Sequence, residues 1–236
     1  MNFFIPNSLH SKILDEIGKW SVIPSKVLFE QLNSKIRYTS FCKIIRKLEA
    51  GGLIKSELTN NRSKILYLTI EGGKVSNMSA PHSYSSVELR HDLFVGVVLR
   101  KLLNHPSLVK GEIFHGDSSL IPDAVVDAVN NDKKFKIAIE LELTQKSLSR
   151  IKDKFNKYRL SKEFNNCLYI FNKPSAFNFY SKLLKKECEA TQKRILLLQD
   201  NNLSSENYNF STLQVWYLGG FRSFDSLFRK GTQNGQ

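Results

Sequence analysis

Three carboxylates stand at a spacing that could hold a metal ion against a phosphate: Asp123, Glu140 and Glu142. Glu140 and Glu142 are two residues apart in an alternating segment, so a strand would place both on one face, roughly 7 Å apart. Mg²⁺ takes carboxylate ligands and keeps several waters, which suits the hydrolysis of a phosphodiester. These carboxylates therefore predict a phosphate-cleaving metal site, with Mg²⁺ as its cofactor.

Basic residues follow these carboxylates along the chain. Lys146 opens a predicted helix over residues 146–160, and Lys154 lies within that helix. A cation beside the scissile phosphate would offset the charge that develops there during hydrolysis. The candidate catalytic residues in this segment are therefore Asp123, Glu140, Glu142, Lys146 and Lys154.

His91 is a sixth candidate, in a polar run just ahead of the predicted sheet. We expect its ring to hydrogen-bond near Asp123 or Glu140, because a lone histidine is more often structural than catalytic. The carboxylates also have two simpler interpretations. They could form ion pairs with the 146–160 helix and only stabilise a scaffold, or the two glutamates could face solvent.

The elements that would position these residues form a mixed α/β sandwich. Helical periodicity predicts helices over residues 88–103, 146–160 and 176–190. Strands are predicted over residues 109–114, 121–126, 135–144, 167–171, 195–199 and 212–218. In the third strand Ile137, Ile139 and Leu141 face one way, while Glu140 and Glu142 face the other.

The first part of the chain predicts three helices and a hairpin, which is the order of a winged helix-turn-helix. Ser8 can cap the first helix, Pro24-Ser25 opens the second, and Thr39 or Ser40 can cap the third. The third helix stops at Gly51-Gly52. Strands from residue 53 and over residues 65–70 then flank a turn at residues 60–63 and are closed by two further glycines.

In winged helices the third helix enters the major groove of DNA, and the wing reaches the flanking backbone or minor groove. The candidate DNA-binding residues on the third helix and at the wing tip are Arg37, Tyr38, Thr39, Ser40, Lys43, Arg46, Lys47, Arg62 and Lys64. Winged helices also serve as protein docking modules, in which case these cations form a solvated face.

Composition agrees with a nucleic-acid partner. The chain has 236 residues, and 41% of them are hydrophobic, which is enough to form a buried core. Its formal net charge of +13 favours binding to polyanions. A polar linker at residues 76–86 suggests two domains, at 1–78 and 84–230. Three scattered cysteines indicate reduced thiols in the cytoplasm. We expect no signal peptide and no membrane span.

Two short motifs carry resemblances to known families. Residues 48–54 with 67–72 resemble the end of the recognition helix and the wing of MarR-like and PadR-like regulators. The order of strands around Pro122-Asp123 and Glu140 resembles the core of the PD-(D/E)XK nuclease-like superfamily. That resemblance implies that Asp123 and Glu140 hold Mg²⁺. The family's lysine position is occupied by Glu142, which is a departure that Lys146 or Lys154 could compensate.

A narrower resemblance covers nearly the whole chain. Residues 90–93, Pro122-Asp123-Ala124, residues 139–144, Lys154 and Tyr158 resemble the replication-relaxation family of plasmid and mobile-element proteins. That family also has an N-terminal winged helix. The resemblance implies a DNA-binding protein of a plasmid or mobile element that acts in replication, relaxation or mobilisation.

Two other functions stay open from the sequence: a Mg²⁺-dependent endonuclease or transposase-type subunit, and a non-enzymatic winged-helix transcriptional regulator. The expected partners are double-stranded DNA and other mobile-element or replication proteins, with no membrane. We also expect a homodimer, because winged helices commonly read two-fold symmetric sites. Its apolar surface would be the aromatic tail with Phe221, Phe224 and Phe228.

Overall fold

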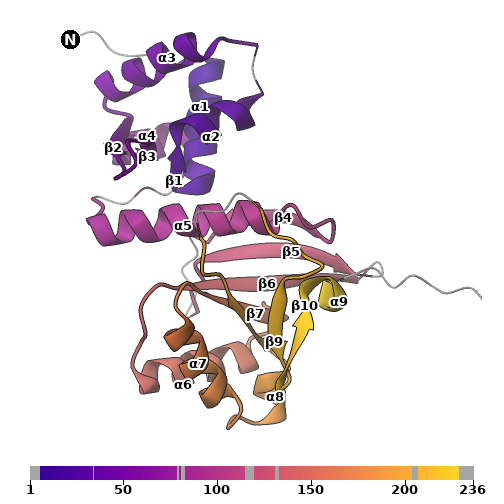
Figure 1. Ribbon diagram of the computed structural model, residues 1–236. Helices are drawn as coiled ribbons and strands as arrows, with labels where there is room; N and C mark the ends of the chain where they lie inside the picture. The colour runs from indigo at the N-terminus through magenta and orange to yellow at the C-terminus, as the bar shows by residue number, and fades with distance from the viewer. Residues whose placement is uncertain are drawn as a thin grey trace, which may run out of the picture. The chain divides into compact units, whose positions relative to one another are not determined.

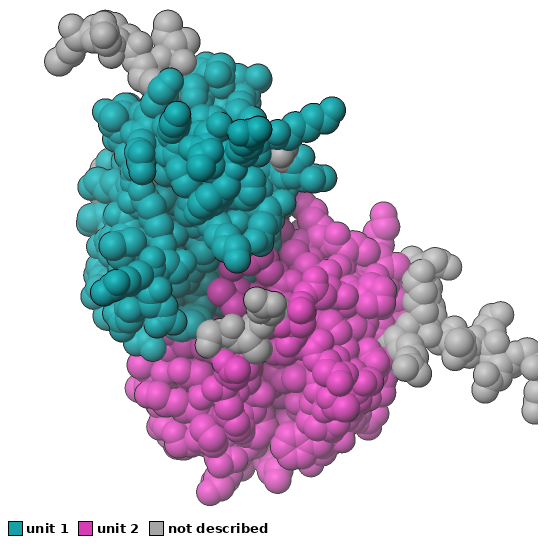
Figure 2. Space-filling view, turned by 45° about the horizontal axis from the view of Figure 1, so that its top comes forward, with its two compact units in different colours: residues 1–96 teal, residues 97–236 magenta. Residues whose placement is uncertain are grey.

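The computed structural model describes residues 6–33, 35–78, 80, 83–114, 120–130, 133–203 and 207–228. The chain divides into two compact units, residues 1–96 and 97–236, which Figure 2 shows in different colours. The division falls inside helix α5 (Ser86–Leu102), which we had assigned wholly to the second domain. Leu89 explains the difference, because it packs on Val22, Ile65 and Tyr67 of unit 1.

Unit 1 contains the three helices and the hairpin that the sequence predicts. Its elements are α1 (Ser8–Trp20), β1 (Val22–Pro24), α2 (Ser25–Leu32), α3 (Tyr38–Ala50), β2 (Ile54–Leu58), β3 (Lys64–Leu68) and α4 (Ile70–Ser76). The strands form a sheet in the order β1-β3-β2. The sequence did not reveal β1, which is only three residues long and pairs antiparallel with β3.

Two helix starts and one strand end in unit 1 differ from the predictions. Asn7, not Ser8, caps α1, in a capping box with His10. α3 begins one residue before Thr39, with Arg37 at the N-cap and no side-chain cap. β3 ends at Leu68 because the Thr69 hydroxyl accepts the N–H of Gly72 and starts α4 there.

Unit 2 is built on a seven-stranded mixed sheet in the order β10-β9-β8-β7-β6-β5-β4 (Figure 1). The strands are β4 (Leu108–Ile113), β5 (Ala124–Asn130), β6 (Lys133–Glu142), β7 (Asn166–Phe171), β8 (Ile195–Gln199), β9 (Gln214–Tyr217) and β10 (Gly220–Ser223). β6, β7 and β8 run parallel, and the other neighbours are antiparallel. The mixed α/β class is therefore confirmed.

Helices cover both faces of this sheet. One face packs against α6 (Leu148–Leu160) and α7 (Pro174–Leu184), with the short α8 (Glu189–Gln192) following α7 (Figure 1). The second half of α5 packs on the other face. Gly111 allows this close approach, because a Cβ there would lie 2.6 Å from Leu99 Cδ1. As a result β6 is buried from residue 137 to residue 142 on both faces.

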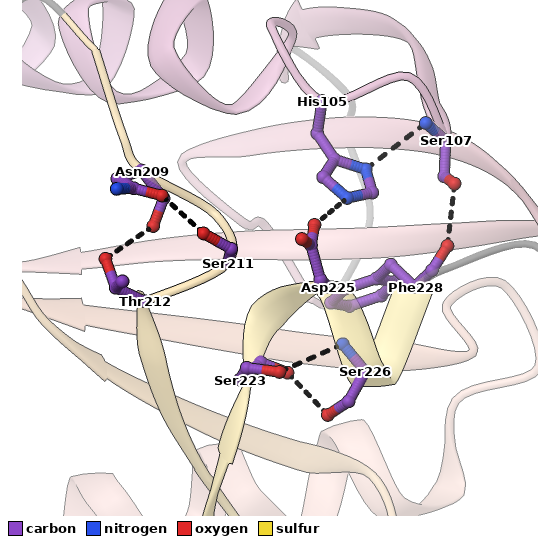
Figure 3. Close-up of polar contacts among 9 residues, drawn as sticks. All are labelled: His105, Ser107, Asn209, Ser211, Thr212, Ser223, Asp225, Ser226 and Phe228. Atoms are coloured by element: carbon purple, nitrogen blue, oxygen red, sulfur yellow. Dashed lines mark hydrogen bonds and ion pairs between the residues drawn. The ribbon is translucent and has the colours of Figure 1, made fainter.

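The last described segment folds back into unit 2. Helix α9 (Phe224–Phe228) is tied to the turn after α5 by polar contacts, which Figure 3 shows. His105 Nε2 lies 3.1 Å from Asp225 Oδ1, and the Ser107 hydroxyl donates to the carbonyl of Phe228 at 2.6 Å. Phe224 and Phe228 are buried, and only Phe221 is exposed. The aromatic tail is therefore mostly internal core and not the dimer surface that we expected.

Candidate functional site

The predicted DNA-binding residues of α3 share an exposed surface of unit 1. All seven side chains that we assigned to this helix and its N-cap are exposed: Arg37, Tyr38, Thr39, Ser40, Lys43, Arg46 and Lys47. The opposite side of α3 is held in the core by Phe41, Ile45 and Leu48. α3 therefore presents basic and hydroxyl groups to solvent along its whole length.

Tyr38 differs from its neighbours because its ring is partly packed. The ring lies 5.1 Å from that of Phe29 and 6.0 Å from that of Phe41, yet the residue is 45% exposed. The aromatic contacts fix the position of the ring at the start of α3 and leave part of it accessible.

The two predicted wing residues have different environments. Arg62 is exposed at the turn between β2 and β3, with φ 57°. Lys64 is half-buried, and its ammonium group lies 2.8 Å from the Glu49 carboxylate at the end of α3. The Lys64–Glu49 ion pair therefore connects the wing to α3, whereas Arg62 is exposed to solvent.

In unit 2 the structure brings Asp123 close to β6. Asp123 immediately precedes β5, and its Oδ2 accepts the N–H of Leu141 at 2.7 Å. Its own N–H donates to the carbonyl of Ile139 at 3.0 Å. These bonds join Asp123 to the residues on either side of Glu140, and they hold its carboxylate beside that glutamate.

Glu140 is the most constrained of the three carboxylates. The residue is 2% exposed, and Lys154 Nζ lies 2.5 Å from its Oε2. The Tyr158 hydroxyl donates to the other oxygen, Oε1. Burial raises the pKa of Glu140 to about 8, and the negative charge of Asp123 adds to the rise, while Lys154 and Tyr158 oppose it.

Glu142 lies two residues further along the same face of β6 and is 4% exposed. Lys146 Nζ lies 4.0 Å from its Oε2, which is beyond hydrogen-bonding distance, and no described residue makes a hydrogen bond to this buried oxygen. Burial raises the pKa of Glu142, against the opposing charge of Lys146 and a hydrogen bond from Tyr180. The expectation that the glutamates could face solvent is therefore wrong.

The structure thus gathers five of the six predicted catalytic residues at one end of the sheet: Asp123, Glu140, Glu142, Lys146 and Lys154. His91 belongs to unit 1, where its Nδ1 lies 3.4 Å from Asp92 Oδ1. Its link to Asp123 or Glu140 stays a prediction.

Sequence reasoning named Tyr158 in a family motif but gave it no chemical role at this site, and it did not name Tyr180. The signal for Tyr158 was present, because it follows Lys154 by one helical turn and must share its face. No comparable signal pointed to Tyr180, which comes from a different helix.

The donor set can be compared with what Mg²⁺ requires. Mg²⁺ is commonly held by one or two carboxylates, with waters and phosphate oxygens completing the octahedron. Asp123 and Glu140 supply such a pair. Among the residues that the structure describes, no group of three or more His, Cys, Asp or Glu side chains is arranged to hold a metal ion. The pair therefore matches the carboxylate count of a metal held jointly with water and substrate, while both Glu140 oxygens also accept from Lys154 and Tyr158.

No family model matches the chain, and no curated protein matches it. The replication-relaxation resemblance therefore stays a prediction. In the part of the chain that the structure describes, no helix has the length and apolar character needed to cross a membrane.

Distant likenesses are found among solved structures. A mutant of ZitR from Lactococcus lactis is 23% identical over 32% of this chain, with a TM-score of 0.27. The restriction endonuclease FokI is 12% identical over 74% of this chain at a TM-score of 0.27, and its DNA-bound form over 82% at 0.26. This chain covers 52% of the ZitR chain and 40% and 43% of the two FokI chains. TM-scores this low carry no conclusion about function.

Proposed function

We propose that this chain is a duplex-DNA-binding protein that uses α3 and the wing of unit 1 as a winged helix. The observation that carries the proposal is the exposed row of cations on α3, with Lys43, Arg46 and Lys47. Arg37 and Arg62 extend the row to the N-cap and the wing. Such a row neutralises backbone phosphates, and the hydroxyl groups of Thr39 and Ser40 stand where base edges would lie.

The DNA is proposed to belong to a plasmid or mobile element, with a role in replication, relaxation or mobilisation. This part rests on the motif resemblance of residues 90–93, Pro122-Asp123-Ala124, residues 139–144, Lys154 and Tyr158. A homodimer on a two-fold symmetric site stays part of the proposal. Light scattering of the chain with and without duplex DNA tests it.

The binding proposal predicts a steep dependence on salt. Each neutralised phosphate contributes roughly −0.9 to the slope of log affinity against log salt. We expect the triple variant Lys43→Ala, Arg46→Ala, Arg62→Ala to lower duplex affinity at least about tenfold and to flatten the slope by about 2.7 if all three contact phosphate. Fluorescence anisotropy with a labelled duplex measures both quantities.

A matched control removes three exposed lysines from α7 and its end in unit 2: Lys182, Lys185 and Lys186. This control loses the same net charge, so a specific surface on unit 1 predicts a smaller effect. Equal losses in the two triple variants would show that only net charge matters, and would remove the winged-helix interface.

A second candidate function is Mg²⁺-dependent cleavage of a phosphodiester in unit 2. One observation favours it: Lys154 of α6 lies against Glu140 and beside Asp123, so a lysine from a helix supplies the cation that Glu142 cannot. In that role Asp123 and Glu140 would hold the metal, and Tyr158 would orient Glu140. Bound Mg²⁺ would supply a polarised water and a charge that stabilises the phosphate.

Lys154 would face the oxygens of the scissile phosphate and offset their developing charge. The Leu141 N–H would keep the Asp123 carboxylate in place through its bond to Oδ2. A supercoiled plasmid incubated with Mg²⁺ or Mn²⁺ tests for nicking. We expect Asp123→Asn and Glu140→Gln each to lower the nicking rate at least about 10³-fold while duplex affinity stays within twofold.

The control for nicking is Asp153→Asn, because Asp153 is an exposed carboxylate on the same helix as Lys154 and pairs with Lys157. It should retain the wild-type rate. Binding to duplex DNA without cleavage by any divalent ion would leave the non-enzymatic regulator as the function of the chain.

A further inference from the structure

A hollow of about 400 Å³ lies in unit 2, away from the carboxylates. It is lined by Lys133, Lys134, Phe135, Asn165, Asn166, Leu196, Tyr217, Leu227 and Phe228. Two of these residues are lysines, and none is acidic. We propose that this hollow binds one nucleotide of a single-stranded DNA segment, with its phosphates on Lys133 and Lys134 and its base against Tyr217.

The strand order explains how the hollow forms. Lys133 and Asn166 begin the neighbouring strands β6 and β7, so the hollow lies at the amino ends of the parallel strands. Glu140 lies about 23 Å further along β6 at roughly 3.3 Å per residue. Side-chain alternation places Asn166, Leu196 and Tyr217 on the face opposite to the packed Cys167, Leu197 and Trp216. The hollow and the carboxylates are therefore on opposite faces of the sheet.

The floor and one wall of the hollow are apolar and aromatic. Leu196 is buried, and Phe135 stacks on Phe228 of α9 with ring centroids 6.2 Å apart. Tyr217 is half-buried, and the Arg222 guanidinium lies 5.8 Å from its ring centroid. Flat apolar walls beside an accessible aromatic ring suit the face of a nucleobase.

The charge around the hollow fits an anion. Lys133 and Lys134, which line the hollow, are both exposed at the start of β6. The Asn165 side-chain carbonyl accepts the N–H of Lys136 at 2.9 Å, which fixes the loop before β7 beside these lysines. A rim of lysines around an aromatic floor is the combination that tracks the backbone and stacks the bases of single-stranded nucleic acid.

The size of the hollow decides between a single strand and a duplex. Sites of about 300–1,000 Å³ take small ligands, so 400 Å³ suits one nucleotide. Bases inside a duplex are stacked and cannot enter such a hollow, whereas a frayed or displaced strand presents free bases. The inference rests on the proposed action on DNA, but it concerns a site separate from both α3 and Glu140.

The test compares a labelled oligo-dT strand with a labelled duplex on the full chain by fluorescence anisotropy. We expect Lys133→Ala with Lys134→Ala to weaken single-strand binding at least about tenfold, and to flatten its salt slope by about 1.4 at roughly 0.7 per phosphate. Duplex affinity should stay within twofold. The control Lys185→Ala with Lys186→Ala removes an equally exposed adjacent pair and should change single-strand affinity less than twofold.

The ring is tested separately. Tyr217→Ala should weaken single-strand binding roughly 5- to 150-fold, the range for loss of one stacked base, whereas Tyr217→Phe should bind like the wild type. Circular dichroism checks that both variants fold. Equal effects of the two lysine pairs, or no effect of Tyr217→Ala in a folded chain, would overturn the inference. Duplex binding without single-strand binding would also overturn it, and single-strand binding without duplex binding would instead overturn the proposed function of unit 1.

Discussion

Unit 2 contains two buried clusters of charged residues that differ in how their polar atoms are satisfied. In the first, Lys101 is 1% exposed and its ammonium group lies 2.6 Å from Asp200 Oδ2. It also donates to the carbonyl of Asn202 and lies over the ring of Tyr208. Asp200 in turn accepts from the Tyr208 hydroxyl and the Asn202 N–H. One charge of each sign is therefore matched, with donors on both carboxylate oxygens.

The second cluster is unbalanced. Glu140 and Glu142 are buried beside Asp123, whereas the nearest cations are Lys154 and the more distant Lys146. One oxygen of Glu142 is buried without a hydrogen-bond partner among the described residues. Buried polar groups are normally paired, so the unpaired oxygen of Glu142 calls for an explanation such as a water, an ion or a catalytic role. The Lys101 cluster is thus fully paired, whereas the Glu140 cluster has more carboxylates than nearby cations.

The largest expected effect concerns Lys101. Removing one partner of a buried ion pair leaves an uncompensated charge, so Lys101→Met should lower the free energy of unfolding by about 3–5 kcal/mol. Lys154→Met should lower it by only about 1 kcal/mol, because Glu140 can then take up a proton. Urea denaturation measures both. Trp216 reports on unit 2 alone in a Trp20→Phe background, since the chain has two tryptophans and Trp20 lies in unit 1.

The double variant Lys101→Met, Asp200→Leu is the internal control for this prediction. Replacing both partners of a buried pair by apolar residues is often neutral, so it should recover most of the stability lost in Lys101→Met. If Lys154→Met were as damaging as Lys101→Met, the two clusters would both be structural, and the contrast between them would disappear.

The sequence predicted Glu140 and Glu142 on one face of a strand, and this follows from the strict alternation of residues 137–142. It could not show that this face is buried, because an alternating strand normally has one solvated face. Burial arises from α6 and α7, whose apolar residues close over the glutamates. Only the folded structure shows that the face of β6 with Glu140 and Glu142 is buried.

The Lys101–Asp200 pair was not predicted at all, because its members are 99 residues apart and neither has a local pattern. The same limit applies to β10 and α9, which are short elements stabilised by long-range contacts such as His105 with Asp225. Long helices with an apolar stripe, such as α3, were predicted well, since their periodicity is contained in the local sequence.

The next effect is a pH dependence specific to the second cluster. The pKa of Glu140 is raised from an ordinary value of 4.5 to about 8, so the folded state binds a proton that the unfolded state releases. That stability is fully present below pH 4.5 and is lost as pH rises through about 8. Between pH 5.5 and 8.5 the wild type should lose a few kcal/mol relative to Glu140→Gln, since one pKa unit corresponds to about 1.4 kcal/mol.

The control for the pH effect is Glu189→Gln. Glu189 is exposed and pairs with Lys193, which lowers its pKa, so its titration lies below this pH window. It should leave the difference between pH 5.5 and pH 8.5 unchanged. A Glu140→Gln chain with the same pH profile as the wild type would show that Glu140 stays ionised throughout and that its cluster is balanced after all.

The smallest effect concerns the unpartnered oxygen of Glu142. Glu142→Gln removes a buried charge while keeping the shape of the side chain, so it should raise the free energy of unfolding at pH 8 by about 1–2 kcal/mol. The equivalent change in the first cluster, Asp200→Asn, should instead lower it by a similar or larger amount, because the ion pair with Lys101 is lost. Urea denaturation of both variants in the Trp20→Phe background measures the sign of each change in the free energy of unfolding. Opposite signs are what a ligand site and a structural pair require, and a loss of stability in Glu142→Gln would place Glu142 among the residues that hold the fold together.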